Sequence, residues 1–174
     1  VVKRLKKFIP NVKYFHMANS AAILTCPGAH FNMVRPGISL YGVTPFGEPH
    51  DDLRPVMKMK APVIIVKEFN KGESVGYNQQ YKTEQNETIA IVQAGYADGI
   101  PTELSNKGEV EIGGTVYPVV GKISMDLVAI RCRNMKLKMD QEAIFWGSDN
   151  INFRLETLAG KYKKTPYEFL TGVT

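Results

Sequence analysis

Asn19 and Ser20 stand directly before the apolar run Ala21 to Thr25, where a helix would begin. The first turn of a helix presents backbone N–H groups that have no partner within the helix, so a hydroxyl placed there contributes to an anion site. A phosphate is the ligand that suits such a site. Capping of the helix by the same two residue types is the alternative interpretation.

Arg35, Pro36, Gly37 and Ile38 follow a short apolar run at Met33-Val34. This order places the Arg35 guanidinium at the end of a strand, which is where ligands bind in α/β domains. Gly37 allows a ligand to approach the backbone closely. An ordinary Pro-Gly turn beside a surface arginine is the competing interpretation.

Tyr96 lies between Gly95 and Gly99 at the end of the β-type run Ile89 to Val92, next to the carboxylate of Asp98. A phenol that is held and exposed in this way can exchange a proton with a ligand, provided that neighbouring positive charge stabilises its anion. A β-turn with a packed tyrosine and a capping aspartate fits the same spacing.

Met125 belongs to a segment, Gly121 to Asp126, that follows another β-type run. Its backbone N–H groups lie beside polar side chains, and two or three such donors can hold a carboxylate. A glycine-kinked strand with a buried methionine is the alternative.

The elements expected to carry Ser20 and Arg35 have the pattern of an α/β domain. Residues 1 to 10 have the apolar spacing of a helix that ends at Pro10, and Val12 to Phe15 is typical of a short strand. The predicted helix over Ala21 to Thr25 and the strand at Met33-Val34 complete the unit.

A linker composition follows, since Val43 to Pro55 holds three of the ten prolines and the pair Asp51-Asp52. Gly113-Gly114 has the spacing of a two-residue hairpin loop between two of the β-type runs beyond it. Short strands with turn signals predict a small β-barrel or sandwich, with two helices at residues 152–162 and 166–170. The six predicted strands are Met57 to Phe69, Glu87 to Ala94, Val110 to Ile112, Thr115 to Val120, Leu127 to Arg131 and Ala143 to Trp146.

Composition excludes several classes. The chain has 174 residues, 44% of them hydrophobic, so it can bury a substantial core. The formal net charge of +5 arises from basic residues dispersed among carboxylates, which does not indicate nucleic-acid binding. No segment predicts a membrane span or a signal peptide, the three histidines lack metal-ligand spacing, and the two cysteines are expected to be reduced. We expect a soluble, cytoplasmic protein, cut from a longer chain because the sequence starts within a helical pattern.

Five motifs, taken together and in order, resemble the alanine racemase family. They are HMANSAA at residues 16–22, RPGISLYG at 35–42, AGYADG at 94–99, VGKISMD at 120–126 and TPYEFLTG at 165–172. Members of this family combine a (β/α)8 barrel, which binds pyridoxal 5′-phosphate, with a C-terminal β-rich domain, and they pair as homodimers. The resemblance implies a mixed, mainly β chain: residues 1–45 as the last one or two β/α units of a TIM-type barrel, 46–56 as a linker and 57–174 as the C-terminal β-barrel-like domain with terminal helices.

The resemblance also assigns cofactor-binding roles. The residue matching Ser20 binds the cofactor phosphate, together with backbone groups matching Gly37 and Ile38. The residue matching Arg35 faces the pyridine nitrogen, which a permanently cationic group keeps unprotonated. We expect residues 1–45, without the rest of the barrel, to expose apolar surface.

Substrate roles follow in the same way. Tyr96 matches the catalytic tyrosine that removes the α-proton from one face of the L-amino acid, while a lysine serves the other face. The backbone at Met125 matches a position that binds the substrate carboxylate, and both residues reach the active site of the opposite subunit. The whole protein is then expected to interconvert L-alanine and D-alanine, which supplies D-alanine for cell-wall peptidoglycan.

Departures from the family pattern limit what this chain is expected to do alone. No lysine here matches the surroundings of the family's cofactor-binding lysine, so we expect the chain to be inactive by itself. Lys122 stands where arginine is frequent in the family, which we expect to alter the substrate entry path. Two alternatives remain open: a racemase of serine, lysine or ornithine, and a non-catalytic racemase-like dimerisation module of a fusion protein.

Overall fold

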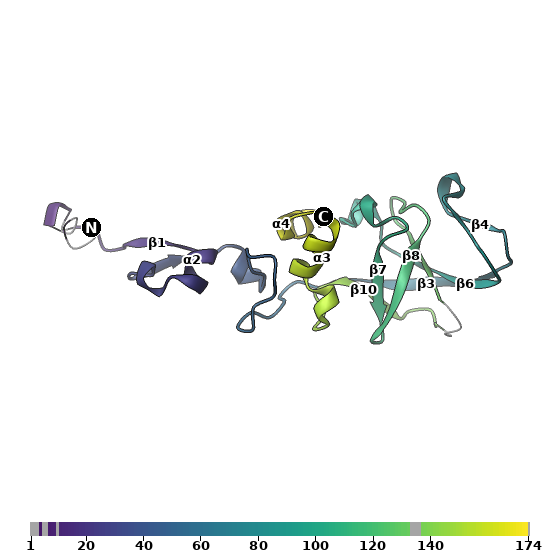
Figure 1. Ribbon diagram of the computed structural model, residues 1–174, viewed down its shortest axis with the longest axis horizontal. Coiled ribbons are helices and arrows are strands. Elements are labelled where there is room, and N and C mark those ends of the chain that lie inside the picture. Colours follow the sequence, from purple (N-terminus) through teal and green to yellow (C-terminus); the bar gives the residue numbers. More distant parts are fainter. Residues whose placement is uncertain (1–3, 5–6, 10, 133–136, 174) are drawn as a thin grey trace.

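The computed structural model describes residues 4, 7–9, 11–132 and 137–173. Figure 1 shows an elongated arrangement, with β1, α2 and β2 at one end, a β-barrel at the other, and the last two helices between them. The helix predicted at residues 1–10 falls largely outside the described residues. Within the part of the chain that is described, no helix is long and apolar enough to cross a membrane.

The N-terminal part is one parallel strand pair with a helix between its strands. Strands β1 (His16–Asn19) and β2 (Met33–Arg35) are parallel, and α2 (Ser20–Thr25) connects them through the 3-10 turn η1 (Pro27–Ala29). The helix and the second strand confirm the predictions. The strand predicted at residues 12–15 is wrong, because pairing begins only at His16.

A contact with a residue distant in sequence accounts for the displaced start of β1. The Phe15 N–H donates to the side-chain oxygen of Asn32 at 2.7 Å, so it is used outside the ladder. Ala18 is fully buried, and its small side chain sits in the middle of β1. Strand β1 thus includes the polar residues His16 and Asn19, which lie in the segment read as a turn. Met17, Met33 and Leu40 are exposed, which confirms the expected apolar surface of the N-terminal part.

Six antiparallel strands form a closed barrel, in the order β10-β3-β6-β9-β8-β7. Closure decides between the barrel and the sandwich that the sequence left open, and each predicted strand is present. Their bounds are β3 (Met59–Phe69), β6 (Glu87–Val92), β7 (Glu109–Ile112), β8 (Thr115–Val120), β9 (Val128–Arg131) and β10 (Glu142–Trp146).

The chain forms one tight hairpin within the barrel and a second hairpin outside it. Gly113 and Gly114 connect β7 to β8 with positive φ at both residues, as the predicted two-residue loop requires. A small hairpin of β4 (Ser74–Val75) and β5 (Tyr81–Lys82) was not predicted, because its strands are too short to show alternation. The connecting 3-10 turns are η2 (Ile38–Tyr41), η3 (Tyr77–Gln79), η4 (Tyr96–Asp98), η5 (Thr102–Leu104) and η6 (Ile151–Phe153).

Helices α3 (Leu155–Tyr162) and α4 (Pro166–Thr171) confirm the two predicted C-terminal helices, although α3 begins three residues later than expected. Residue 154 has extended backbone angles, and η6 precedes it, so the helical spacing from residue 152 belongs to two separate elements. Trp146 and Phe169 are buried with ring centroids 5.6 Å apart in an edge-to-face arrangement. This pair attaches α4 to the core of the barrel.

Candidate functional site

Ser20 is the first residue of α2 and is buried. The helix starts here because the Asn19 side chain accepts a hydrogen bond from the Ala22 N–H at 3.1 Å, as the cap preferences predict. Capping is therefore the work of Asn19. The Ser20 hydroxyl is left for another role.

Three groups donate to the Ser20 hydroxyl oxygen: the Gly37 N–H at 2.8 Å, the Ser39 N–H at 3.3 Å and the Ser39 hydroxyl at 3.1 Å. A hydroxyl has two lone pairs and one proton of its own. The two N–H groups use both lone pairs, so the third contact is a hydroxyl–hydroxyl hydrogen bond that Ser20 shares with Ser39. This cluster of two backbone N–H groups and two hydroxyls at the start of a helix carries no negative charge, so it suits an anion.

Arg35 is the last residue of β2 and is paired in register with Asn19, so it lies at the same strand ends as Ser20. Its side chain is exposed and has no hydrogen-bond or ion-pair partner within the described residues. A permanent cation at the strand ends that carry Ser20 suits an anionic ligand.

Tyr96 opens the 3-10 turn η4 and is 51% exposed. The Asp98 carboxylate accepts from the Gly95 N–H at 2.8 Å, and Gly99 ends the turn with φ of 93°. Asp98 therefore caps the turn, as one interpretation held, but the tyrosine is not packed. Its backbone is held by the turn, and about half of the residue is exposed.

Met125 lies beside Tyr96, although 29 positions separate them in the sequence. The Tyr96 N–H donates to the Ser124 carbonyl oxygen and the Ala97 N–H to the Met125 carbonyl oxygen, both at 3.0 Å. Met125 is 49% exposed, so the buried-methionine alternative is wrong. The Met125 N–H donates to no acceptor among the described residues and is available to a ligand.

No hydrogen bond or ion pair joins Tyr96 or Met125 to Ser20 or Arg35, all of which are described residues. Helix α4 lies between the two groups. One side of α4 and the segment of Gly37 line a common cavity of about 230 Å³. Gly172, the residue that follows α4, contacts Gly99 in the turn of Tyr96. The cavity is lined by Gly37, Ile38, Tyr41, Tyr167, Leu170 and Thr171.

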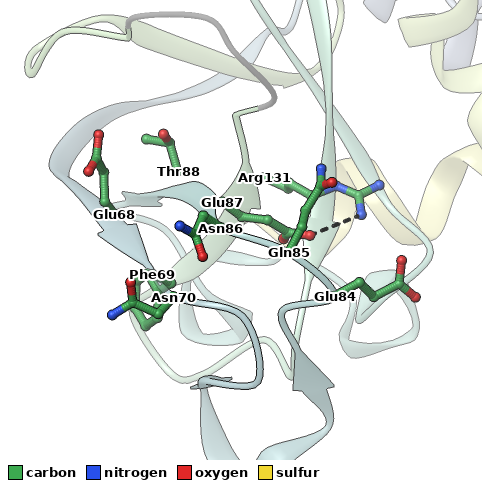
Figure 2. A pocket seen from close by; sticks show the side chains of 9 residues that line it. All are labelled: Glu68, Phe69, Asn70, Glu84, Gln85, Asn86, Glu87, Thr88 and Arg131. Carbon is green, nitrogen blue, oxygen red and sulfur yellow. Dashed lines mark ion pairs between the residues drawn. The ribbon is translucent and has the colours of Figure 1, made fainter.

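A larger polar cavity of about 480 Å³ lies at the other side of the barrel and contains none of the predicted residues (Figure 2). Arg131 and Glu87, which both line this cavity, form an ion pair with Nη1 and Oε1 4.0 Å apart. Burial, and then the hydrogen bond to Glu87, raise the pKa of the neighbouring Tyr81. Sequence reasoning missed this cavity, because its residues come from three segments that each have the pattern of ordinary surface. It is lined by Glu68, Phe69, Asn70, Glu84, Gln85, Asn86, Glu87, Thr88 and Arg131.

Comparison with known families explains why these turns occur together. The family model described as the alanine racemase C-terminal domain matches residues 56–174. The chain belongs to the alanine racemase family. The model of the N-terminal domain of alanine racemase matches residues 1–45.

Curated relatives agree with this assignment. The alanine racemase of Vesicomyosocius okutanii is 43% identical over 159 residues, which cover 91% of this chain and 44% of that protein. The alanine racemase of Salinispora arenicola is 40% identical over 136 residues, which cover 78% of this chain and 37% of that protein. The chain spans less than half the length of these relatives.

Solved structures of family members superpose on almost the whole chain. Alanine racemase of Clostridium difficile 630 in complex with cycloserine has a TM-score of 0.87 at 35% identity, covering 99% of this chain and 46% of that one. Alanine racemase of Bartonella henselae with covalently bound pyridoxal phosphate has a TM-score of 0.81 at 32% identity, covering 99% and 48%. The mainly β alanine racemase fold expected from the motifs is confirmed.

Proposed function

We propose that the whole protein interconverts L-alanine and D-alanine with pyridoxal 5′-phosphate, supplying D-alanine for peptidoglycan. One observation carries the proposal. The turn of Tyr96 and the turn of Met125 are hydrogen-bonded to each other, which places the backbone of the exposed Tyr96 beside that of Met125, whose N–H is unused. A proton-transfer group beside a carboxylate-binding group is what an amino-acid racemase requires.

The cofactor would be held by the N-terminal part. The Ser20 side chain and the backbone N–H of Ile38 would bind its phosphate. Gly37, which the resemblance also assigns to the phosphate site, would contribute through its N–H, which donates to the Ser20 hydroxyl oxygen at 2.8 Å. Pyridoxal 5′-phosphate, when bound, withdraws electrons from the α-carbon of an amino acid and so acidifies the α-proton. Arg35, which keeps its charge at all relevant pH values, would face the pyridine nitrogen and keep it unprotonated.

Tyr96 would take the α-proton from the L enantiomer at its phenolic oxygen and return it to that face in the reverse direction. The Met125 N–H would bind the substrate carboxylate and fix which face of the α-carbon the phenol meets. Because each of the two enantiomers presents its proton on a different face, a second base is needed, and we assign none of the lysines of this chain to it.

The proposed assembly is a cytoplasmic homodimer in which Tyr96 and Met125 complete the active site of the partner subunit. Within the chain we propose residues 1–45 as part of the cofactor barrel, 46–56 as the connection and 57–174 as the C-terminal domain. The family membership and the exposed apolar side chains of the N-terminal part support this division.

The test uses the whole protein loaded with pyridoxal 5′-phosphate. Tyr96→Phe should slow the exchange of the L-alanine α-proton with solvent deuterium by about 10²- to 10⁴-fold, the range attributed to one general base, and exchange from D-alanine much less. Tyr14→Phe, at another exposed tyrosine, is the control. Equal rates of exchange in Tyr96→Phe and in the unchanged protein would refute the role of Tyr96. A kcat/KM for serine, lysine or ornithine that exceeds the value for alanine would show that alanine is not the preferred substrate.

A further inference from the structure

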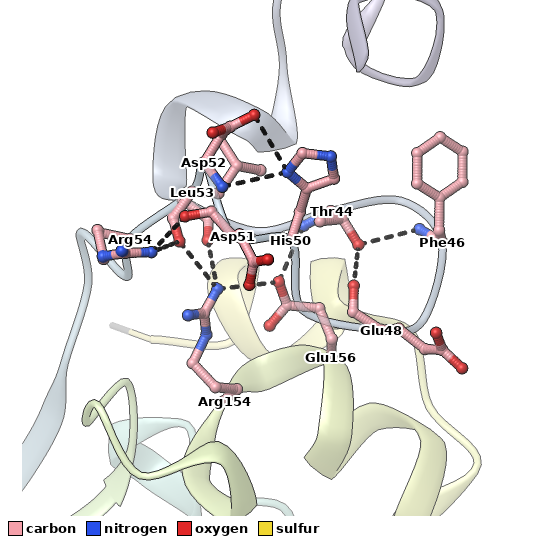
Figure 3. Close-up of polar contacts among 11 residues, drawn as sticks. Thr44, Phe46, Glu48, His50, Asp51, Asp52, Leu53, Arg54, Arg154 and Glu156 are labelled. Carbon is pink, nitrogen blue, oxygen red and sulfur yellow. Dashed lines mark hydrogen bonds and ion pairs between the residues drawn. The ribbon is translucent and has the colours of Figure 1, made fainter. Parts of the chain in front are cut away.

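The connection between the two parts of the chain is fastened to the start of α3 (Figure 3). Glu156 is fully buried, and its Oε1 accepts a hydrogen bond from the Thr44 N–H at 3.0 Å. Arg154 donates through Nη2 to the Gly42 carbonyl oxygen at 3.3 Å and to the Leu53 carbonyl oxygen at 3.4 Å. The two side chains therefore bind both ends of residues 42–56, which form the connecting loop.

Arg154 and Glu156 also pair with each other, with Nη2 and Oε1 3.5 Å apart. Their pairing is incomplete, since Arg154 Nε and Glu156 Oε2 are buried without a hydrogen-bond partner among the described residues. A buried ion pair of this kind adds little to stability, because desolvation of the charges offsets their attraction. Such pairs are instead retained in some proteins because they select one arrangement of the elements around them.

Every contact of this pair with the loop goes to a backbone atom. The loop is tightly closed as well: Gly42 has φ of 71°, and a Cβ atom there would lie 1.6 Å from the Arg54 carbonyl oxygen. The Val56 N–H donates to the Tyr41 carbonyl oxygen at 3.1 Å, next to Gly42. The end of η2, the turn that begins at Ile38 directly after Gly37, is therefore fixed relative to α3.

We propose that Arg154 and Glu156 are positioning residues that set the orientation of the Ser20 part of the chain relative to the barrel that carries Tyr96. This inference rests on the proposed function, in which the two parts contribute different groups to one active site. Without the pair, the loop keeps its composition but loses the three hydrogen bonds that join it to α3. The packing of Ile38 and Val43 in the same core as the barrel strands remains, and without those hydrogen bonds the two parts take a wider range of relative orientations.

The variant that isolates positioning from stability is Arg154→Met with Glu156→Leu. Apolar residues of similar volume in place of a buried ion pair are often neutral for stability, whereas removing one partner leaves a buried charge unpaired. The matched control is Lys60→Met with Glu142→Leu, because that exposed pair, 2.6 Å apart, joins two strands within the barrel. Glu156→Gln keeps one side-chain oxygen that can accept from both the Thr44 N–H and Arg154 Nη2, so it serves as the conservative variant and remains testable if the double variant does not fold.

The first readout requires neither cofactor nor activity. The chain has a single tryptophan, Trp146, in the barrel core, and an exposed cysteine, Cys26, just after α2; the other cysteine, Cys132, is buried. Energy transfer from Trp146 to an acceptor on Cys26 therefore reports the relative placement of the two parts. We expect a narrow distribution of Trp146 lifetimes in the unchanged chain, the control and Glu156→Gln, and a broad one in the double variant.

The second readout is kinetic and uses the whole protein with its cofactor. In the double variant kcat should fall by about 10²-fold, which is the effect of misplacing reacting groups by about 1 Å, while KM changes less. The Glu156→Gln protein should keep most of the kcat of the unchanged protein. An unchanged lifetime distribution in the double variant would overturn the inference. Absence of racemisation in the unchanged protein would instead refute the proposed function, and the lifetimes would still decide the positioning.

Discussion

Gly95 and Met125 are in direct backbone contact. A Cβ atom added to Gly95 would lie 2.1 Å from the Met125 carbonyl oxygen and 2.3 Å from its carbonyl carbon. The φ angle of Gly95 is −151°, which any residue adopts, so the glycine is needed for space alone. This contact lets the turn of Tyr96 pack closely against the backbone of Met125.

Gly95→Ala should destabilise the chain by about 1–3 kcal/mol, the usual cost of forcing atoms into a filled space, because backbone on both sides must move. Equilibrium urea unfolding measures the change. Gly160→Ala is the control: a Cβ there meets nothing within 4 Å in α3, so that variant should gain roughly 0.5–1 kcal/mol. Stability unchanged by Gly95→Ala would show that the two turns can separate freely.

Ser20→Ala should weaken binding of pyridoxal 5′-phosphate to the whole protein by about tenfold or more, since a hydrogen bond to a charged group contributes about 1.5–3 kcal/mol. Titration followed by the visible absorption of the cofactor gives the dissociation constant. Thr25→Ala on the same helix removes a hydroxyl that donates only to the Ala21 carbonyl oxygen, at 3.0 Å, and should leave the constant unchanged. Equal constants in all three proteins would remove Ser20 from the phosphate site.

Cys132 should resist thiol reagents at pH 8 while Cys26 reacts. Burial raises the pKa of the Cys132 thiol to about 11, so about one molecule in a thousand carries the reactive thiolate at that pH. Mass spectrometry after brief labelling should find one modification in the folded chain and two in urea. Two modifications under native conditions would contradict the burial.

The same thiol makes stability depend on pH. Because the folded pKa is above the ordinary value of 9.0, the contribution of Cys132 is fully present below pH 9 and is lost as pH rises toward 11. Unfolding measured at pH 8 and pH 10.5 should therefore show a loss that is smaller in Cys132→Ala. An identical loss in the variant would mean that other groups cause it.

Substitutions at the two glycines of the β7–β8 loop should have different effects on stability. Gly113 and Gly114 have φ of 57° and 80°. Gly113→Asn should be neutral or slightly stabilising, because asparagine accepts this conformation and reduces the freedom of the unfolded chain. Gly114→Val should cost about 1–2 kcal/mol or more, because a β-branched residue is strained at positive φ. Thermal unfolding of the two variants compares them, and equal Tm values would contradict the assigned turn.

Local chemistry made several features predictable from the sequence. Apolar runs bounded by turn residues were sufficient for the barrel strands, since each strand is a short local pattern. Gly113-Gly114 predicted its hairpin because only residues that tolerate positive φ fit there, and Asn19 predicted the start of α2 because its side chain caps the Ala22 N–H in the first turn. The ordered motifs, from HMANSAA to TPYEFLTG, were enough to identify the family.

Other features depend on contacts between residues that are distant in sequence. The start of β1 was misplaced because the side chain of Asn32 takes the N–H of Phe15, which no local pattern encodes. The small size of β4 and β5 left no alternation to detect. Whether the β-type runs form a barrel or a sandwich is decided by the pairing of β7 with β10, which closes the sheet.

The sequence by itself determined the residue types of the site: a hydroxyl at a helix start, an arginine at a strand end, and a tyrosine and a methionine in two glycine-containing turns. Only the tertiary structure decided that Tyr96 and Met125 share one surface, and that Arg154 and Glu156 fasten the connecting loop. Spacing along a chain constrains neighbours within a few residues, whereas these contacts are fixed by the closure of the barrel and by which buried polar groups find partners.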